Sequence, residues 1–184
     1  NASLKKVQKS LNTINICFLM APLYHKAMKN VAEVRAQLKV PTLFNILGPL
    51  LNPANATTQL IGVYSKEWLL PMASCLSLLN VKRAWLVHGR DGLDEITTTT
   101  KTDVVEVYGK KITQFTIDPI KLGIQKAKIS QIKGKDAEYN ATQIRNLFAN
   151  INKNKYYEDI VVLNTAAVFL ISGKCNNIKK GIEL

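Results

Sequence analysis

A short apolar run that ends in an acidic turn restricts the fold of this chain more than any other feature. Residues 84–87 read Ala-Trp-Leu-Val, which is typical of a strand buried on both faces, as in a parallel sheet. The turn that follows, residues 88–95, carries two glycines and three carboxylates. In open α/β sheets ligands bind beyond the carboxyl ends of the strands, and clustered carboxylates suit a hard cation such as Mg²⁺. The turn therefore indicates a metal and phosphate site, with a solvated acidic turn as the alternative.

Strand and helix patterns alternate along the first half of the chain. Strand patterns cover residues 59–64 and 84–87, and a helical pattern with a proline near its first turn covers residues 67–79 between them. Residues 103–107 and 112–117 flank a Tyr-Gly-Lys-Lys turn, which predicts a β-hairpin. The sequence therefore predicts an α/β fold, in which a partly parallel sheet is flanked by helices and carries a hairpin insertion.

Further helices are expected toward both ends of the chain. Ser3 can cap a helix over residues 4–11, and residues 24–38 form a second amphipathic pattern, while residues 14–20 between them are β-rich. Three more helical patterns follow the hairpin: residues 136–151 capped by Asp136, residues 157–172 ended by Gly173, and residues 177–184. The second of these three is too apolar for a surface helix and is expected to be buried.

Length, charge and cysteine spacing restrict the class of protein. The 184 residues suffice for one domain with a substantial core, and no apolar run reaches the roughly 18 residues of a membrane span. The net charge of +12 is compatible with an anionic substrate or with nucleic acid, but the lysines are spread along the chain. The three cysteines lie far apart in apolar segments, which predicts buried, reduced thiols in a cytoplasmic protein.

Three long motifs and one helix resemble the anthranilate phosphoribosyltransferase family, which belongs to the nucleoside phosphorylase-like glycosyltransferases. The motifs are FLMAPLYHKAMKNV (residues 18–31), TLFNILGPLLNP (residues 42–53) and VHGRDGLDE (residues 87–95). The helix is LNTAAVFLISGK (residues 163–174). These segments follow one another at the family's spacing and cover nearly the whole chain. The chain is therefore identified as similar to the C-terminal portion of such an enzyme.

The resemblance implies a reaction, a cofactor and partners. The family transfers phosphoribose from phosphoribosyl pyrophosphate to the amine of anthranilate, a step of tryptophan biosynthesis, and Mg²⁺ assists the departure of pyrophosphate. It implies that residues 1–184 form a single α/β domain fragment, in which residues 24–53 resemble part of the family's small helical subdomain. A homodimer is implied for the full enzyme, whereas a membrane or nucleic-acid partner is not expected.

The resemblance also implies roles for five residues. Asp94 and Glu95 match the pair that binds the metal, where carboxylates hold Mg²⁺ against pyrophosphate. His25, Arg35 and Pro49 match parts of the anthranilate site. The planar guanidinium of an arginine suits a carboxylate because it can donate two parallel hydrogen bonds. No side chain is assigned as a general acid or base.

One part of the family's active site is missing from residues 1–184. The family's glycine-rich phosphate loop precedes this region, and residues 1–17 contain no glycine from which such a loop could be built. The isolated chain is therefore expected to be inactive in phosphoribosyl transfer. Two alternatives remain open: a non-catalytic, nucleic-acid-binding relative on the same scaffold, for which the positive charge speaks, and a nucleoside phosphorylase of the same superfamily.

Overall fold

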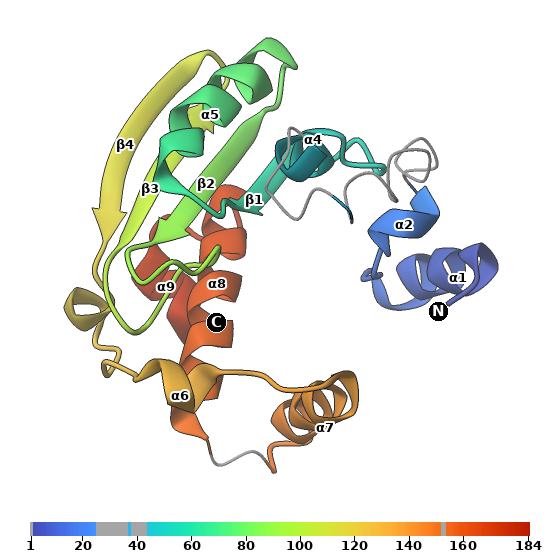
Figure 1. Cartoon of the computed structure of the whole chain (residues 1–184), viewed down its shortest axis with the longest axis vertical. Coiled ribbons are helices and arrows are strands. Elements are labelled where there is room, and N and C mark those ends of the chain that lie inside the picture. The colour runs from blue at the N-terminus through green and yellow to red at the C-terminus, as the bar shows by residue number, and fades with distance from the viewer. Residues whose placement is uncertain (1, 25–36, 38–43, 152–153) are drawn as a thin grey trace. The chain divides into compact units, whose positions relative to one another are not determined.

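The computed structural model describes residues 2–24, 37, 44–151 and 154–184, and the chain divides into two compact units between Ala56 and Thr57 (Figure 1). The first unit contains the helices α1 (Leu4–Ile14), α2 (Ala21–Tyr24) and α4 (Phe44–Leu50). Ser3 caps α1 as predicted, because its hydroxyl accepts a hydrogen bond from the Lys6 amide.

The β-rich run expected at residues 14–20 is not a strand. Ile14 is the last residue of α1, and Asn15 ends the helix in the left-handed conformation with φ at 57°. Residues 16–20 have no regular structure, and the described part of this unit offers no neighbouring strand with which they could pair. The amphipathic helix expected at residues 24–38 lies almost entirely outside the described residues.

The second unit is built on a four-stranded sheet in the order β1-β2-β3-β4. The strands are β1 (Thr58–Gly62), β2 (Arg83–Gly89), β3 (Thr102–Tyr108) and β4 (Lys111–Ile117). β1 and β2 are parallel, whereas β2 pairs with β3 and β3 with β4 in antiparallel fashion. The predicted partly parallel sheet and the predicted hairpin are both confirmed.

The helices predicted for this unit are present, and a further short helix at residues 129–132 was not predicted. The helices are η2 (Lys66–Trp68), α5 (Leu69–Leu78), η3 (Pro119–Leu122), α6 (Ile129–Ile132), α7 (Ala137–Phe148), α8 (Lys155–Ile171) and α9 (Ile178–Glu183). Asp136 caps α7 by accepting a hydrogen bond of 2.8 Å from the Tyr139 amide. Gly173, with φ at 81°, follows the end of α8 in the left-handed conformation that glycine adopts without strain. Among the described residues, no helix combines the length and the apolar character needed to cross a membrane.

Helices cover both faces of the sheet. Because side chains alternate along each strand, apolar side chains lie on both faces and are buried by these helices. α5 packs against β2 and β3 on one face, and α8 lies against β1 and β2 on the other (Figure 1). The core on the α8 side consists of residues from β2, β3, β4, α8 and the connecting segments: Trp85, Val87, Ile96, Val104, Ile117, Ile124, Leu163, Ala167 and Ile171. The buried α8 predicted from its apolar sequence is confirmed at its inward face.

The expectation of three buried thiols is wrong. Cys75 is exposed and Cys17 and Cys175 are half-buried, although all three are free as predicted. The reason is the helical period of α5, in which Met72 and Leu76 face the sheet and Cys75 points to solvent. An apolar neighbourhood in sequence did not distinguish the two faces of this short helix.

A buried carboxylate joins three elements near the sheet's end. Asp103 of β3 accepts hydrogen bonds from Arg90 at 2.7 Å and from Thr116 at 3.3 Å, and it forms an ion pair of 3.0 Å with Lys66. Hydrogen bonds from Arg90 and then Lys66 outweigh burial and lower the pKa of Asp103 to about 2.

Acid should therefore unfold this chain partly through Asp103. Because its folded pKa lies below the unfolded value of 3.8, the carboxylate contributes stability above pH 3.8 that is lost as pH falls toward 2. The contribution at neutral pH is about 2 kcal/mol. Urea unfolding between pH 2 and 6 should show the Asp103→Asn variant losing this pH-dependent part. The control is Glu183→Gln, at an exposed carboxylate. If both variants changed the pH dependence of the free energy of unfolding equally, Asp103 would not be its source.

Candidate functional site

The acidic turn lies where the two parallel strands end. β2 ends at Gly89, and β1, whose Gly62 pairs with Val87, ends beside it. The turn is closed by backbone hydrogen bonds from the Gly89 amide to the Leu93 carbonyl at 2.8 Å and from the Gly92 amide to the Gly89 carbonyl at 2.9 Å. The structure thus places the turn at the sheet edge where α/β proteins bind ligands.

The first of the three carboxylates holds the turn together. Asp91 accepts a hydrogen bond of 3.1 Å from the Leu93 amide, one of 2.6 Å from the Thr97 hydroxyl, and another from the Thr99 hydroxyl. Burial opposes the ionised form of Asp91, but the two threonine hydroxyls outweigh it and lower the pKa of the carboxyl. Asp91 is therefore a structural residue of the turn.

The other two carboxylates are exposed. Asp94 and Glu95 follow each other directly after Leu93, whose carbonyl closes the turn. Protein atoms packed around the Glu95 carboxyl, together with the charge of Asp94, raise the pKa of Glu95. Within the residues that the structure describes, no three His, Cys, Asp or Glu side chains gather as a metal site. The carboxylates available to a cation are thus a pair whose charges repel each other, and a cation would relieve that repulsion.

A side chain of α8 fixes the backbone beside this pair. Asn164 accepts a hydrogen bond of 3.1 Å from the Ile96 amide and donates one of 2.9 Å to the Ile96 carbonyl. Its amide nitrogen also donates to the carbonyl of Ile160 in its own helix at 2.9 Å. Because both backbone groups of Ile96 are held, the residue that follows Glu95 cannot move without breaking these bonds.

A glycine at the end of β1 lets the turn approach the sheet. A Cβ atom at Gly62 would lie 1.8 Å from the Asp94 carbonyl oxygen and 2.8 Å from its carbonyl carbon. Neither atom belongs to a flexible side-chain end, so the backbone of the acidic turn would have to shift. Glycine at position 62 is therefore a condition for the observed position of Asp94.

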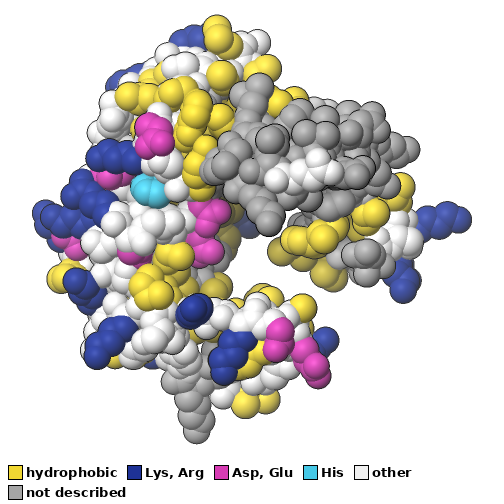
Figure 2. All heavy atoms as spheres, in the orientation of Figure 1, with side chains coloured by type: hydrophobic (Ala, Val, Ile, Leu, Met, Phe, Trp, Pro, Cys, Tyr) yellow, Lys and Arg dark blue, Asp and Glu magenta, His cyan; other side chains and the backbone are white. Residues whose placement is uncertain are grey.

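A pocket of about 660 Å³ adjoins the acid pair. It is lined by Leu93 and Glu95 of the turn, by α6 with the loop after it, and by α8. The volume is within the range of small-molecule sites. Lys133 lines the same pocket as Glu95, so a ligand there would meet a carboxylate and an ammonium group. Figure 2 shows that other Lys and Arg side chains are spread over the visible face.

The predicted anthranilate residues cannot be compared in the same way. His25 and Arg35 lie outside the described residues. Pro49 lies in α4, where the backbone is helical, but its side chain is not among those described. Their roles stay predictions.

Sequence reasoning missed the supporting residues of the turn. Gly62 lies within a plain strand pattern, and Asn164 lies within an apolar helical pattern. Thr97 and Thr99 belong to a run of four threonines that begins two residues after Glu95. That run was the one available signal, since small hydroxyl side chains beside a carboxylate commonly bond to it.

Replacing Asn164 should loosen the acidic turn. We expect Asn164→Ala to lower the free energy of unfolding by about 1–3 kcal/mol, because it leaves the Ile96 amide and carbonyl without their partner. Amide hydrogen exchange of Ile96 should rise more than that of the core strands. Thr165→Ala is the control, since this exposed hydroxyl bonds only within α8, to the Val161 carbonyl. Equal rates of amide exchange at Ile96 in wild type and in Asn164→Ala would contradict the proposal that Asn164 holds the backbone of Ile96 in place.

Comparisons with known proteins show the family to which this chain belongs. The profile of the glycosyl transferase family, a/b domain, matches residues 1–184. An anthranilate phosphoribosyltransferase of Azospirillum brasilense is 47% identical over 177 residues, which are 96% of this chain and 49% of that protein. The crystal structure of the Thermus thermophilus enzyme of that name superimposes with a TM-score of 0.86 at 38% identity, over 97% of this chain and 52% of that one.

A third comparison concerns ligands. The anthranilate phosphoribosyltransferase of Saccharomyces cerevisiae, solved in complex with PRPP and Mg, matches with a TM-score of 0.80 at 30% identity. The match covers 91% of this chain and 48% of that one. The chain thus spans about half the length of the proteins it resembles. The resemblance predicted from the sequence motifs is confirmed.

Proposed function

This chain belongs to the glycosyl transferase family whose a/b domain matches residues 1–184, and from that premise we propose that it is part of an anthranilate phosphoribosyltransferase. In this proposal the enzyme transfers phosphoribose from phosphoribosyl pyrophosphate to anthranilate and releases pyrophosphate. The observation that carries it is the exposed Asp94–Glu95 pair at the common end of β1 and β2, in a chain similar to enzymes of that name.

The acid pair fits Mg²⁺. This ion usually takes one or two carboxylates from the protein and completes its shell with water and substrate phosphates. Asp94 and Glu95 supply two carboxylates, and the pKa of Glu95 is raised first by the protein atoms packed around its carboxyl group and then by the charge of Asp94. The Mg-containing complex of the yeast enzyme supports the same ion here.

The chain's own residues have distinct parts in the proposed reaction. Bound Mg²⁺ would offset the negative charge that develops on departing pyrophosphate. Asp94 and Glu95 would hold the ion at the sheet edge, and Gly62 and Asn164 fix the backbone that carries them. Lys133 supplies positive charge to phosphates in the adjoining pocket.

Anthranilate is proposed to bind at His25, Arg35 and Pro49. The guanidinium of Arg35 would pair with the substrate carboxylate, while His25 and Pro49 would limit the space around the ring. These roles rest on the motifs alone, as do a cytoplasmic location and a homodimer of the full enzyme. We further propose that residues 1–184 alone do not catalyse transfer, because the phosphate loop of the family is not among them.

A chimeric enzyme tests the proposal. Residues 1–184 would replace the matching stretch of the Azospirillum brasilense protein, and transfer would be followed by the loss of anthranilate fluorescence. We expect Mg²⁺-dependent transfer by the chimera and none by the 184-residue chain alone. A folded chimera without transfer would contradict the proposed reaction, and transfer by the chain alone would contradict its dependence on a further segment.

A further inference from the structure

A second pocket lies in the same unit, on the other side of the loop after α6. Its volume is about 490 Å³, within the range of small-molecule sites. It is lined by residues 130–135, by α7 and by the beginning of α8. It shares Ile132, Lys133, Gly134 and Tyr157 with the pocket beside the acid pair, but Glu95 does not line it. Of the residues that line it, only Lys133 has a part in the proposed reaction.

The walls of the second pocket are positively charged. Lys133, Lys135 and Lys155 line it, and its lining contains no Asp or Glu among the described residues. Lys155 is paired with Asp159 at 2.6 Å, and that pairing leaves the ammonium groups of Lys133 and Lys135 as the larger source of positive potential. The first turns of α7 and α8 both border the pocket, and their dipoles add to that potential.

The pocket is held open by side-chain amides. Asn140 of α7 accepts a hydrogen bond of 2.9 Å from the Lys135 amide and donates one of 3.0 Å to the Lys135 carbonyl. Asn154, at the start of α8, donates one of 2.8 Å to the Gln131 carbonyl. The loop between α6 and α7 is therefore tied to both helices, and the pocket is preformed in this unit.

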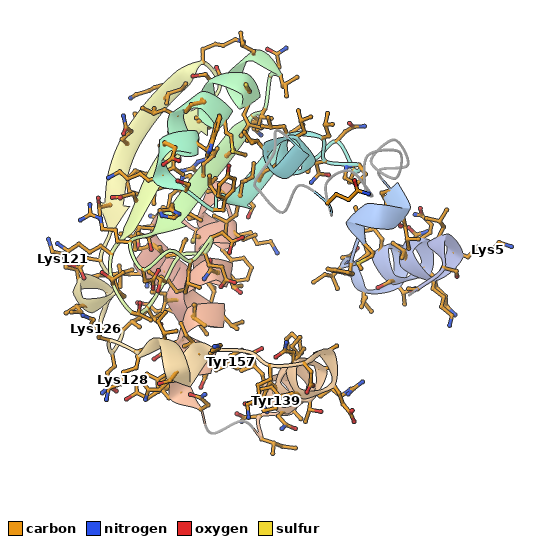
Figure 3. The ribbon with its side chains drawn as sticks, viewed as in Figure 1. Lys5, Lys121, Lys126, Lys128, Tyr139 and Tyr157 are labelled. Carbon is orange, nitrogen blue, oxygen red and sulfur yellow. The ribbon has the colours of Figure 1, made fainter. Side chains whose placement is uncertain are left out.

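Aromatic rings complete the lining. Tyr139, on α7, and Tyr157, near the start of α8, both line the pocket and are labelled in Figure 3. The ammonium group of Lys135 lies 4.7 Å from the centroid of the Tyr139 ring. Tyrosine rings offer flat faces for stacking and hydroxyl groups for hydrogen bonds. A flat ring and an anionic group would thus both find partners here.

We propose that this pocket binds a small anionic ligand that carries a flat ring, of the nucleoside monophosphate class. The phosphate would lie against Lys133 and Lys135, and the ring would stack on Tyr139. The site is separate from the acid pair and needs no metal ion. This inference stands whether or not the chain contributes to phosphoribosyl transfer.

The test uses the 184-residue chain without divalent cations. Adenosine monophosphate and inorganic phosphate would be titrated separately and followed by NMR shifts of amides in the loop after α6. We expect saturable binding of the nucleotide, tighter than that of phosphate. Lys135→Ala should weaken both about tenfold, a loss of about 1.4 kcal/mol, whereas Tyr139→Ala should reduce nucleotide affinity to that of phosphate.

Matched controls separate this site from general attraction to a basic protein. Lys121 and Lys126 are exposed and do not line the pocket (Figure 3), so Lys121→Ala and Lys126→Ala should leave affinity unchanged. Asp94→Asn should also leave it unchanged, which separates this site from the acid pair. No saturation by the nucleotide, or equal losses in Lys126→Ala and Lys135→Ala, would overturn the proposal, as would loss of binding in Asp94→Asn.

Discussion

Replacing Gly62 with alanine is expected to displace the acidic turn and to abolish most of the proposed activity. The new Cβ would lie 1.8 Å from the Asp94 carbonyl oxygen, a distance that packing cannot accommodate. Either the end of β1 or the backbone of the turn at Asp94 must move. We expect the free energy of unfolding to fall by about 1–3 kcal/mol. A displacement of about 1 Å at a positioned group costs about a hundredfold in rate.

The measurement compares transfer by the chimeric enzyme with and without the substitution, alongside urea unfolding of the chain. Gly48→Ala is the control, since a Cβ at Gly48 meets no atom within 4 Å. Alanine is also the better residue inside the helix α4. If Gly62→Ala kept both wild-type rate and wild-type stability, the close approach of the turn to β1 would not matter for function.

Neutralising Asp94 or Glu95 should lower the rate of transfer without lowering the free energy of unfolding. Asp94→Asn and Glu95→Gln keep the shape of each side chain but remove the charge that holds a cation. We expect each to lower the rate of the chimera by about a hundredfold or more, as does loss of one preorganised electrostatic group elsewhere. Excess Mg²⁺ should restore part of the rate in the single variants, because one carboxylate remains.

The unfolding curve gives the second readout. Burial and the charge of Asp94 raise the pKa of Glu95, so the ionised Glu95 is disfavoured in the folded chain. Without metal, Glu95→Gln should therefore leave the chain as stable as wild type or slightly more stable at pH 7. An Asp91→Asn variant is the contrast, because it should lose stability through its bonds to Thr97 and Thr99. Wild-type activity in Glu95→Gln would refute the role of the pair.

Much of the second unit could be predicted from local patterns. The apolar run at residues 84–87 forms part of β2, and β3 and β4 form the predicted hairpin around the Gly-Lys turn. Asp136 caps the start of α7, and Gly173 follows the end of α8, as expected. These features depend on strand or helix periodicity and on capping, which are encoded by neighbouring residues. The strand predicted at residues 14–20 is absent because a strand also needs a neighbouring strand to pair with. The β propensity of its own residues does not provide that partner.

The site was predicted in part. The sequence located the acidic turn and its pair, yet it grouped Asp91 with Asp94 and Glu95, since spacing cannot tell a carboxylate that faces its own turn from one that faces solvent. Asn164 lies 68 positions beyond Ile96, so its hydrogen bonds to the Ile96 backbone depend on how α8 crosses the sheet. The role of Gly62 depends on a contact distance in the folded chain. The roles of Asn164 and Gly62 therefore depend on tertiary contacts, which cannot be predicted from the periodicity of the sequence.

A cation site at Asp94 and Glu95 is best tested by titrating the isotope-labelled 184-residue chain with Mn²⁺, a paramagnetic substitute for Mg²⁺. We expect the amide signals of residues 91–96 and of Gly62 to broaden first, and this local broadening to disappear in the Asp94→Asn, Glu95→Gln double variant. A well-dispersed spectrum of that variant would show that it is folded. Broadening centred elsewhere in the chain, or unchanged broadening of the turn in the double variant, would contradict a cation site at this pair.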